Sequence, residues 1–315
     1  MTASTPRIGI IGTGAIGGFY GAMLAQAGQD VHFLLRSEYE AVARDGLHIN
    51  STVHGELHLK PVQAYRSASD MPKCDWLLVG AKSTSNRQLA PLIVEAAAEG
   101  AKVVVLQNGL GVEDDLREAL PEHIHLLGGL CFICVHRLAL GVIEHQALGG
   151  INLGYHSGQA AGTEQQQLLV EQGVELFRTA GIDSNPASNL AQARWQKLVW
   201  NVPYNGLSVL LDAGTAPMMA NPASRALIRA IMLEVCEAAA ACGYPLPGVL
   251  ADRMLASTDH MPNYLPSMYH DYTQRRPMEL EAIYAAPLAA AAAAGVHMPK
   301  TEALYQALQF KSERI

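Results

Sequence analysis

A glycine-rich turn near the start of the chain most constrains how it can fold. The turn reads Gly12-Thr13-Gly14-Ala15-Ile16-Gly17 and follows the apolar run Ile8-Gly9-Ile10-Ile11. Phe19 to Ala27 suits a helix, and Val31 to Leu35 suits a second strand. In such a turn the first glycine permits the sharp bend, the second lets a pyrophosphate approach, and the third lets helix and strand pack closely. The phosphates then meet free N–H groups at a helix N-terminus. The pattern predicts a dinucleotide-binding βαβ unit, with an ordinary strand–turn–helix as the alternative.

Length and composition favour a large, well-packed globular protein. The chain has 315 residues, of which 50% are hydrophobic and 16% charged, and its net charge is −7. This length predicts two domains. This excess of acidic over basic residues argues against nucleic acid as a partner. The longest apolar stretch, Ile283 to Met298, contains Pro287 and Gly295 and is too short to span a bilayer, so no membrane role is expected.

Cysteine usage and the start of the chain predict a cytoplasmic protein. No signal peptide is visible in Met1 to Pro6. The five cysteines are scattered and odd in number, which fits reduced thiols. Cys131 and Cys134 form a C-x-x-C pair, but their neighbours resemble a strand, on which residues three apart point to opposite faces. No second pair completes a site, so no metal is expected.

The first part of the chain alternates strand-like and helix-like segments. Strands are predicted at Arg7–Ile11, Val31–Leu35, Trp76–Ala81, Val103–Gln107 and Leu126–Val135. Helices are predicted at Gly18–Ala27, Glu38–Arg44, Asn86–Glu99 and Glu113–Leu120. Added hairpin strands are predicted at Leu47–Asn50, Glu56–Val62, Val142–His145 and Ile151–Tyr155. The alternation predicts an α/β fold with a doubly wound, Rossmann-type parallel sheet.

The second part of the chain is expected to be all helical. A helix at Thr163 to Ala180, closed by Gly181, precedes a polar boundary segment at residues 182–186. Beyond it, helical spacing covers Ala187–Leu211, Pro222–Cys242, Gly248–Leu255, Pro277–Ala294 and Thr301–Phe310. We therefore expect a nucleotide-binding domain over residues 1–186 and a substrate domain over residues 187–315, with the second substrate in the cleft between them.

Basic and amide side chains follow the ends of the predicted strands. Arg36 comes at the end of the second strand, where an arginine can accept a ribose 2′-phosphate and a carboxylate would accept the 2′-hydroxyl. No carboxylate precedes Arg36 in that strand, although Glu38 follows it. Lys82 and Asn108 follow two further strands, at the sheet edge where ligands bind in this fold. A surface arginine and a simple Asn-Gly turn are the alternative interpretations.

A lysine and two asparagines in the second part share one helical face. Lys197, Asn201 and Asn205 follow each other at intervals of four residues, which keeps them on one side of a helix. Amides can donate to a carboxylate while an ammonium faces a ketone, so the face suits a 2-oxo acid. The alternative is a solvated amphipathic stripe.

Several motifs in one order carry a resemblance to a known family. They are the glycine turn, the strand end at Lys82, Leu106-Gln107-Asn108-Gly109-Leu110-Gly111, the Lys197–Asn201–Asn205 face, and Ser267-Met268 followed by Glu279-Leu280-Glu281. Together, from Arg7 to about Leu308, they resemble the ketopantoate reductases (2-dehydropantoate 2-reductases).

That resemblance implies NADPH-dependent reduction of 2-dehydropantoate to (R)-pantoate, in the route to pantothenate and coenzyme A. It implies that Lys197 is the catalytic acid, and that Asn108, Asn201, Asn205 and Ser267 hold the substrate. It also implies that Glu279 sits near the nicotinamide ribose, and that residues 12–17, Arg36, Lys82 and Asn108 hold the cofactor. A small 2-oxo acid is the expected partner, and a homodimer is left open.

Some positions depart from the family pattern. An aspartate and an Asn-Gly pair usually follow the Glu279 position, where this chain has Glu281 and Tyr284-Ala285. Thr215 stands where some members have a further asparagine, and Pro203 interrupts the predicted helical face. The alternatives are therefore a paralogue that reduces another 2-oxo acid and a non-catalytic NADP(H)-binding redox sensor.

Overall fold

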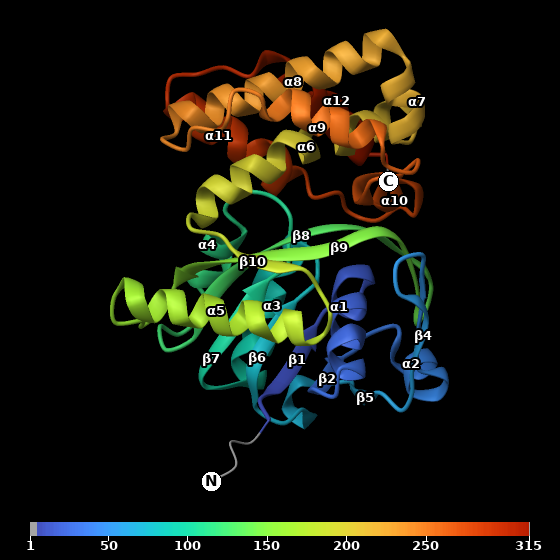
Figure 1. Cartoon of the computed structure of the whole chain (residues 1–315), viewed down its shortest axis with the longest axis vertical. Coiled ribbons are helices and arrows are strands. Elements are labelled where there is room, and N and C mark those ends of the chain that lie inside the picture. Colours follow the sequence, from blue (N-terminus) through green and yellow to red (C-terminus); the bar gives the residue numbers. More distant parts are fainter. Residues whose placement is uncertain (1–4, 315) are drawn as a thin grey trace. The chain divides into compact units, whose positions relative to one another are not determined.

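The computed structural model describes residues 5–314 and divides into two compact units. Unit 1 contains the described residues up to Gln107 together with Val112–Leu190. Unit 2 contains Asn108–Gly111 and the described residues from Ala191 onward. Figure 1 shows the strands in the first of these units and mainly helices in the second. The predicted division into a nucleotide-binding and a substrate domain after residue 186 stays a prediction.

Unit 1 is built on one ten-stranded sheet (Figure 1). The strands are β1 (Arg7–Ile11), β2 (Asp30–Leu34), β3 (Leu47–Ser51), β4 (Gly55–Leu59), β5 (Gln63–Tyr65), β6 (Cys74–Val79), β7 (Ala97–Val105), β8 (His125–Ala139), β9 (Val142–Ser157) and β10 (Ser184–Pro186). Strands β5, β2, β1, β6, β7 and β8 are parallel neighbours in that order. Strand β9 pairs antiparallel with β8, and the β3–β4 hairpin continues the sheet beyond β9. The predicted Rossmann-type sheet with added hairpin strands is confirmed.

The helices of unit 1 connect these strands. They are α1 (Ala15–Gln26), α2 (Tyr39–Asp45), α3 (Asn86–Ala96), α4 (Val112–Arg117) and α5 (Thr163–Thr179), with short 3₁₀ turns η1 (Ala68–Asp70) and η2 (Ser83–Ser85). Helix α5 packs on β9 and β10. The two short strands predicted at 142–145 and 151–155 form one strand, because bulges between β8 and β9 absorb the irregular residues Leu148 and Gly149, both at positive φ. Strands β5 and β10 were not predicted, since three residues are too few to show alternation.

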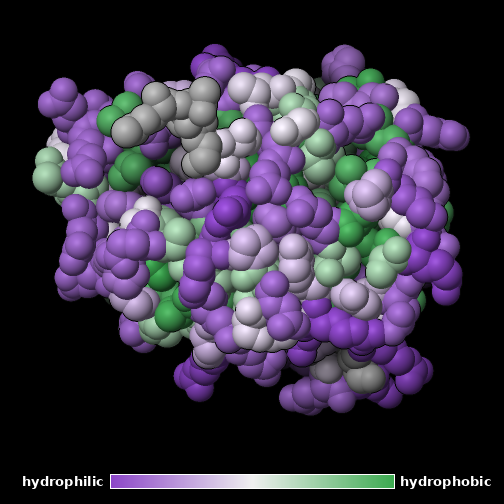
Figure 2. All heavy atoms as spheres, turned by 90° about the horizontal axis from the view of Figure 1, so that it is seen from below, coloured by the Kyte–Doolittle hydropathy of each residue, from purple (hydrophilic) through white to green (hydrophobic). Residues whose placement is uncertain are grey.

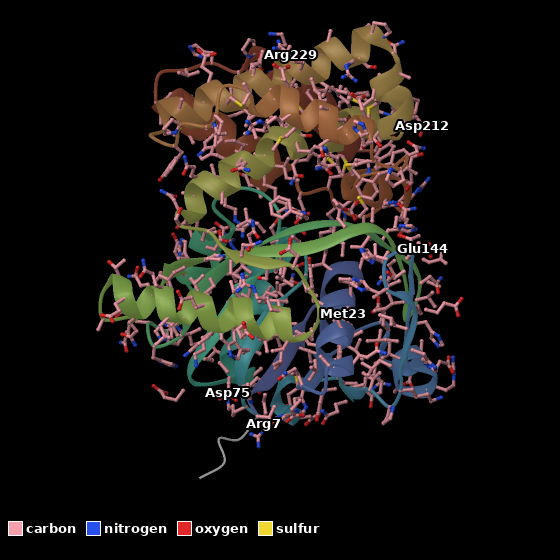
Figure 3. The ribbon with its side chains drawn as sticks, viewed as in Figure 1. Arg7, Met23, Asp75, Glu144, Asp212 and Arg229 are labelled. Carbon is pink, nitrogen blue, oxygen red and sulfur yellow. The ribbon has the colours of Figure 1, made fainter. Side chains whose placement is uncertain are left out.

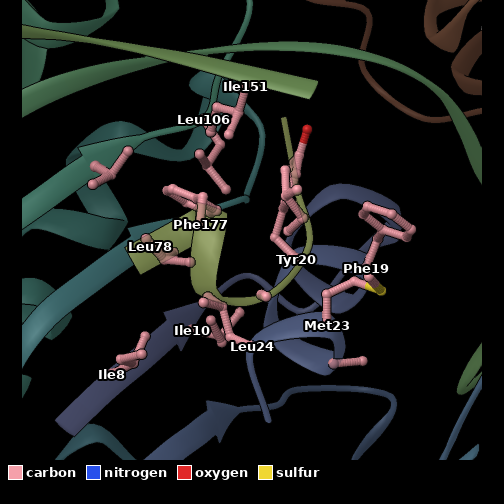
Figure 4. Close-up of a cluster of buried hydrophobic side chains, with 14 of the residues drawn as sticks. Ile8, Ile10, Phe19, Tyr20, Met23, Leu24, Leu78, Leu106, Ile151 and Phe177 are labelled. Atoms are coloured by element: carbon pink, nitrogen blue, oxygen red, sulfur yellow. The ribbon is translucent and has the colours of Figure 1, made fainter. Parts of the chain in front are cut away.

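Helix α1 lies in the core of unit 1 (Figure 4). Its sequence is apolar or glycine on nearly every side, which is typical of a fully buried helix. Phe19, Tyr20 and Leu24 have no exposed surface and belong to the same cluster as Ile10 of β1. The Tyr20 hydroxyl donates to the Gly150 carbonyl of β9 at 3.1 Å. This packing fixes the N-terminus of α1, where the glycine turn ends.

Unit 2 is helical around its own hydrophobic core. Its elements are α6 (Leu190–Leu211), α7 (Thr215–Ala220), α8 (Pro222–Ala241), α9 (Leu250–Asp259), α10 (Ser267–Thr273), the π-helical segment η3 (Glu281–Ala285), α11 (Ala286–Ala293) and α12 (Pro299–Ser312). Helices α7 and α10 were not predicted, because six and seven residues are too short to show a helical period. The single helix predicted at 277–294 is wrong in its first turns, where η3 stands before α11.

Local sequence signals fix the long helix α8. Asn221 accepts the backbone N–H groups of Ala223 and Ser224, and Pro222 occupies the first helical turn, where its missing N–H is harmless. On its exposed side, Arg229 (labelled in Figure 3) makes a two-pronged ion pair with Asp252 of α9. Such exposed pairs contribute little to stability, so α8 is stabilised mainly by packing of its buried face in the core of unit 2.

A buried carboxylate on α8 caps the start of α12. Glu234 is 8% exposed and accepts the backbone N–H groups of Lys300 and Thr301 at 3.0 and 2.9 Å. It also accepts the Thr301 hydroxyl at 3.0 Å and the Lys300 ammonium at 3.1 Å. Helix α12 has no side-chain cap at Met298, so Glu234 supplies this function from another helix.

Glu234→Ala should lower the free energy of unfolding by about 2–3 kcal/mol, because it leaves buried donors of α12 without their acceptor. Urea unfolding measures the loss. Glu237→Ala is the control, since Glu237 is exposed on the same helix and should change stability by less than about 0.5 kcal/mol. Equal stability of the two variants would contradict the role given to Glu234.

Candidate functional site

The three glycines of the turn have three different surroundings. Gly12 has a φ of 90°, and a Cβ there would lie 2.3 Å from the Ala81 amide nitrogen. A Cβ at Gly17 would lie 2.3 Å from the Gly12 carbonyl oxygen, so the helix and the turn are in close contact. A Cβ at Gly14 would meet no atom within 4 Å. The first and third glycines are therefore required by packing, and the second faces open space.

The open space at Gly14 adjoins the N-terminus of α1. Gly14 is the N-cap residue, no side chain caps the helix, and no acidic residue stands in its first turn. The Thr13 hydroxyl does not cap α1, because it donates to the Leu34 carbonyl of β2 at 3.2 Å. Ala15 and Ile16 are partly exposed residues, and they precede Gly18, the donor of the first helical bond to the Gly14 carbonyl. These features fit the pyrophosphate of a dinucleotide.

The carboxylate that follows Arg36 is held by another residue. Arg36 is exposed just after β2, whereas Glu38 is only 5% exposed. The Glu38 carboxylate pairs with the Arg137 guanidinium of β8. Burial raises the pKa of Glu38, and the charge of Arg137 acts in the opposite direction. Arg36 therefore stands at the end of β2 while the nearby carboxylate is engaged.

A buried glutamine that the sequence analysis did not single out ties two strand ends together. Gln107 follows β7, and its side-chain amide donates to the Ala81 carbonyl at 3.0 Å and to the Asn86 side chain at 2.7 Å. Lys82 is half-buried beside this contact, directly before η2. The only sequence signal for Gln107 is its place beside Asn108 at a strand end.

The predicted lysine–asparagine face lies on α6 and is buried. Lys197, Asn201 and Asn205 are 9%, 6% and 2% exposed. The Asn205 amide donates to the Asn201 carbonyl at 3.0 Å, and its oxygen accepts the Met268 backbone N–H at 3.3 Å. Asn205 therefore links α6 to the start of α10, whose first residue is the half-buried Ser267. A solvated stripe does not describe these side chains.

The Asn108 segment is docked onto η3. Leu110 donates its backbone N–H to the Ala282 carbonyl at 2.8 Å. Gly109 has a φ of 108°, and a Cβ there would lie 2.4 Å from the Ala282 Cβ. Asn108 is half-buried, and Glu279, two residues before η3, is 3% exposed. The Asn-Gly pair is thus more than a free turn, because the contact with Ala282 requires its glycine.

Two of the residues that depart from the family pattern are built into unit 2. Tyr284 is fully buried, and its hydroxyl donates to the Val202 carbonyl of α6 at 2.8 Å. Thr215 is 1% exposed and exchanges two hydrogen bonds with the backbone of Tyr264, at 2.9 and 3.0 Å. Both side chains therefore support the helical unit directly.

Within residues 5–314, the structure places no group of three or more metal-ligating side chains together. Cys131 and Cys134 are buried on β8 and form no disulfide, and burial raises the pKa of Cys134 to about 12. Among the described residues, no helix is both long and apolar enough to cross a bilayer. The face shown in Figure 2 is largely hydrophilic.

Comparison with known proteins identifies the chain as an oxidoreductase. Residues 8–158 match the family model described as ketopantoate reductase PanE/ApbA, and residues 189–312 match that of its C-terminal part. The chain belongs to the ketopantoate reductase family.

Individual relatives agree over nearly the whole chain. A 2-dehydropantoate 2-reductase of Nostoc sp. is 42% identical, over 98% of this chain and 96% of the relative. A crystal structure of 2-dehydropantoate 2-reductase from Geobacter metallireducens is 40% identical with a TM-score of 0.89, covering 98% of this chain and 99% of that one. One from Methylococcus capsulatus is 36% identical with a TM-score of 0.84, covering 98% and 97%.

Proposed function

We propose that this protein reduces 2-dehydropantoate to (R)-pantoate with NADPH, in the route to pantothenate and coenzyme A. The observation that carries the proposal is the buried face of Lys197, Asn201 and Asn205 on α6. A buried ammonium beside two amides is suited to a small anion that also carries a ketone. The relatives at 36–42% identity bear the name of this activity.

Each residue of the site has a proposed part in the reaction. When bound, NADPH supplies the hydride that reduces the ketone carbon. Lys197 stabilises the alkoxide that develops on the ketone oxygen and donates a proton to it. A single positioned donor at such an oxygen contributes about 2.7–4 kcal/mol to catalysis. Asn108, Asn201, Asn205 and Ser267 hold the substrate, and Glu279 lies near the nicotinamide ribose and Lys197.

The proposed cofactor site uses the glycine turn and two basic side chains. Residues 12–17 hold the pyrophosphate against the N-terminus of α1, where Gly14 leaves room for it. Arg36 holds the 2′-phosphate of NADPH, and Lys82 and Asn108 face the cofactor from the ends of β6 and β7. Because Arg137 engages Glu38, the carboxylate nearest to Arg36 in the chain does not oppose that phosphate.

Arg36→Ala should weaken NADPH binding by about 10- to 100-fold and leave NADH binding within about twofold, because only NADPH carries the 2′-phosphate. Fluorescence titration with each cofactor measures both constants. Arg44→Ala is the matched control, since Arg44 is an exposed arginine of α2 that pairs with its neighbour Asp45. An equal loss for both cofactors, or none, would remove the assignment of Arg36.

The proposed activity is tested by following NADPH and NADH oxidation with a panel of 2-oxo acids. Turnover of 2-dehydropantoate in preference to the others is the expected result. Preference for another 2-oxo acid would indicate a paralogue with a different substrate. Binding of NADPH with no turnover of any 2-oxo acid would indicate a redox sensor and contradict the proposal.

We also propose that the protein works in the cytoplasm. None of the five cysteines forms a disulfide, which supports this location because cytoplasmic thiols remain reduced. A homodimer stays a prediction, and light scattering of the purified protein checks it.

A further inference from the structure

Two hydrogen bonds join the π-helical segment η3 (Glu281–Ala285) to backbone groups next to residues of the proposed substrate site. A single turn of π-helix is rare in proteins and occurs frequently at functional sites. One contact is made by the hydroxyl of Tyr284 and the other by the backbone carbonyl of Ala282. Both partners belong to unit 2.

The Tyr284 hydroxyl lies at one step of the α6 hydrogen-bond ladder. It donates to the Val202 carbonyl at 2.8 Å. Gly206, one turn further along α6, closely approaches the same hydroxyl. Asn201 immediately precedes Val202, and Asn205 immediately precedes Gly206. The hydroxyl therefore contacts α6 beside both asparagines.

The surrounding residues are suited to hold the hydroxyl there. A Cβ at Gly206 would lie 2.5 Å from the Tyr284 hydroxyl oxygen, so a larger residue would displace it. Pro203 lacks the N–H that would pair with the Val199 carbonyl, which loosens the neighbouring step of the ladder. The Tyr284 ring is stacked on Tyr305, with centroids 6.2 Å apart and an interplanar angle of 12°. The position of the hydroxyl is therefore fixed from both ends of the side chain.

The second contact fixes the backbone beside Asn108. The Ala282 carbonyl accepts the Leu110 N–H at 2.8 Å, and Gly109 approaches Ala282 so closely that any Cβ would collide with it. This carbonyl belongs to η3, where the wider π-helical turn changes the ordinary pairing of backbone groups. One short segment thus touches both α6 and the Asn108 segment.

We propose that η3 is the positioning element of the substrate site: Tyr284 sets the spacing of Asn201 and Asn205, and Ala282 sets the place of Asn108. The inference rests on the proposed function, because it concerns the amides that would hold the 2-oxo acid. Tyr284 is a positioning residue, since its hydroxyl is occupied by the α6 backbone. The inference also gives a role to Tyr284, which stands where family members usually have an asparagine.

Tyr284→Phe tests this inference, because it removes the hydroxyl and keeps the buried ring. We expect KM for 2-dehydropantoate to rise by about tenfold or more, as small misplacements of positioning groups do. The Kd for NADPH should stay within about twofold. Tyr204→Phe is the matched control: Tyr204 is buried on α6, the helix that the Tyr284 hydroxyl contacts, and its own hydroxyl contacts the Met219 sulfur at 2.9 Å. The control should leave KM unchanged, whatever either variant does to the melting temperature.

Two further measurements separate positioning from general destabilisation. In the double variant with Asn201→Ala, the two effects on KM should be less than additive, because they act through one contact. Gly109→Ala tests the contact between the Asn108 segment and Ala282 and should also raise KM. If Tyr284→Phe does not fold, Gly109→Ala is the variant that tests the inference. A folded Tyr284→Phe protein with wild-type KM overturns the inference, as does additivity, or an unchanged KM in Gly109→Ala. A wild-type protein that does not turn over 2-dehydropantoate overturns the proposed function and this inference together.

Discussion

Lys197→Ala should reduce kcat by about 10²–10⁴, the usual effect of losing a positioned proton donor. Lys197 is the charged member of the buried α6 face, and its two neighbours there are neutral amides. The alkoxide formed from the ketone would then lose both its stabilising charge and its proton source. The Kd for NADPH should change little, because the pyrophosphate and 2′-phosphate are assigned to the glycine turn and Arg36.

Steady-state kinetics and a cofactor titration measure the two halves of this prediction. Lys197→Met is the companion variant, since it keeps an unbranched apolar stem and removes only the charged end. Both variants should have the circular dichroism spectrum of the wild type. A folded Lys197→Ala protein with wild-type kcat would contradict the mechanism and move the proton donor elsewhere, with Lys82 the first residue to test.

The glycine turn gives a prediction in which two similar substitutions have opposite consequences. Gly14→Ala should fold with normal stability, because its Cβ meets no atom within 4 Å, yet weaken NADPH binding by about tenfold or more. The added methyl group would occupy the space that the pyrophosphate needs. Gly17→Ala should instead destabilise unit 1, because its Cβ would lie 2.3 Å from the Gly12 carbonyl oxygen.

Thermal unfolding and cofactor titration of both variants distinguish the two roles. Gly17→Ala should lose more than about 2 kcal/mol of stability, as overpacked buried positions do. Normal NADPH binding by Gly14→Ala would mean that the open space beside α1 does not receive the phosphates.

Local patterns were sufficient to predict most of the elements and the shared face of α6. The strand before Gly12 and the helix after it follow from an apolar run and a glycine turn, which act over a few residues. The i, i+4 spacing of Lys197 and Asn201 places them on one side of α6 whatever surrounds the helix. Their burial was not predictable in the same way, because it depends on how the helix packs.

Features made by distant residues were not accessible from the sequence. The π-helical turn in η3 is joined to Leu110 and to Val202, which are far away in the chain. The cap that Glu234 provides for α12 bridges 66 positions. No regular spacing in the sequence predicts contacts between such distant residues. The sequence analysis therefore singled out Tyr284 only as a departure from the family pattern.

The ion pair between Glu38 and Arg137 bears on how a protein of this kind could change its coenzyme. Under the proposed assignment, replacing Arg36 with an uncharged residue would remove the attraction for a 2′-phosphate, and Glu38, already engaged by Arg137, would not supply an acceptor for a ribose 2′-hydroxyl. Use of Glu38 as that acceptor would require its release from Arg137. Such a path passes through an intermediate with a buried, unpaired charge, which is strongly destabilising. The pair thus makes Glu38 a costly source of a 2′-hydroxyl acceptor, so a change of coenzyme would more easily begin at position 36 itself.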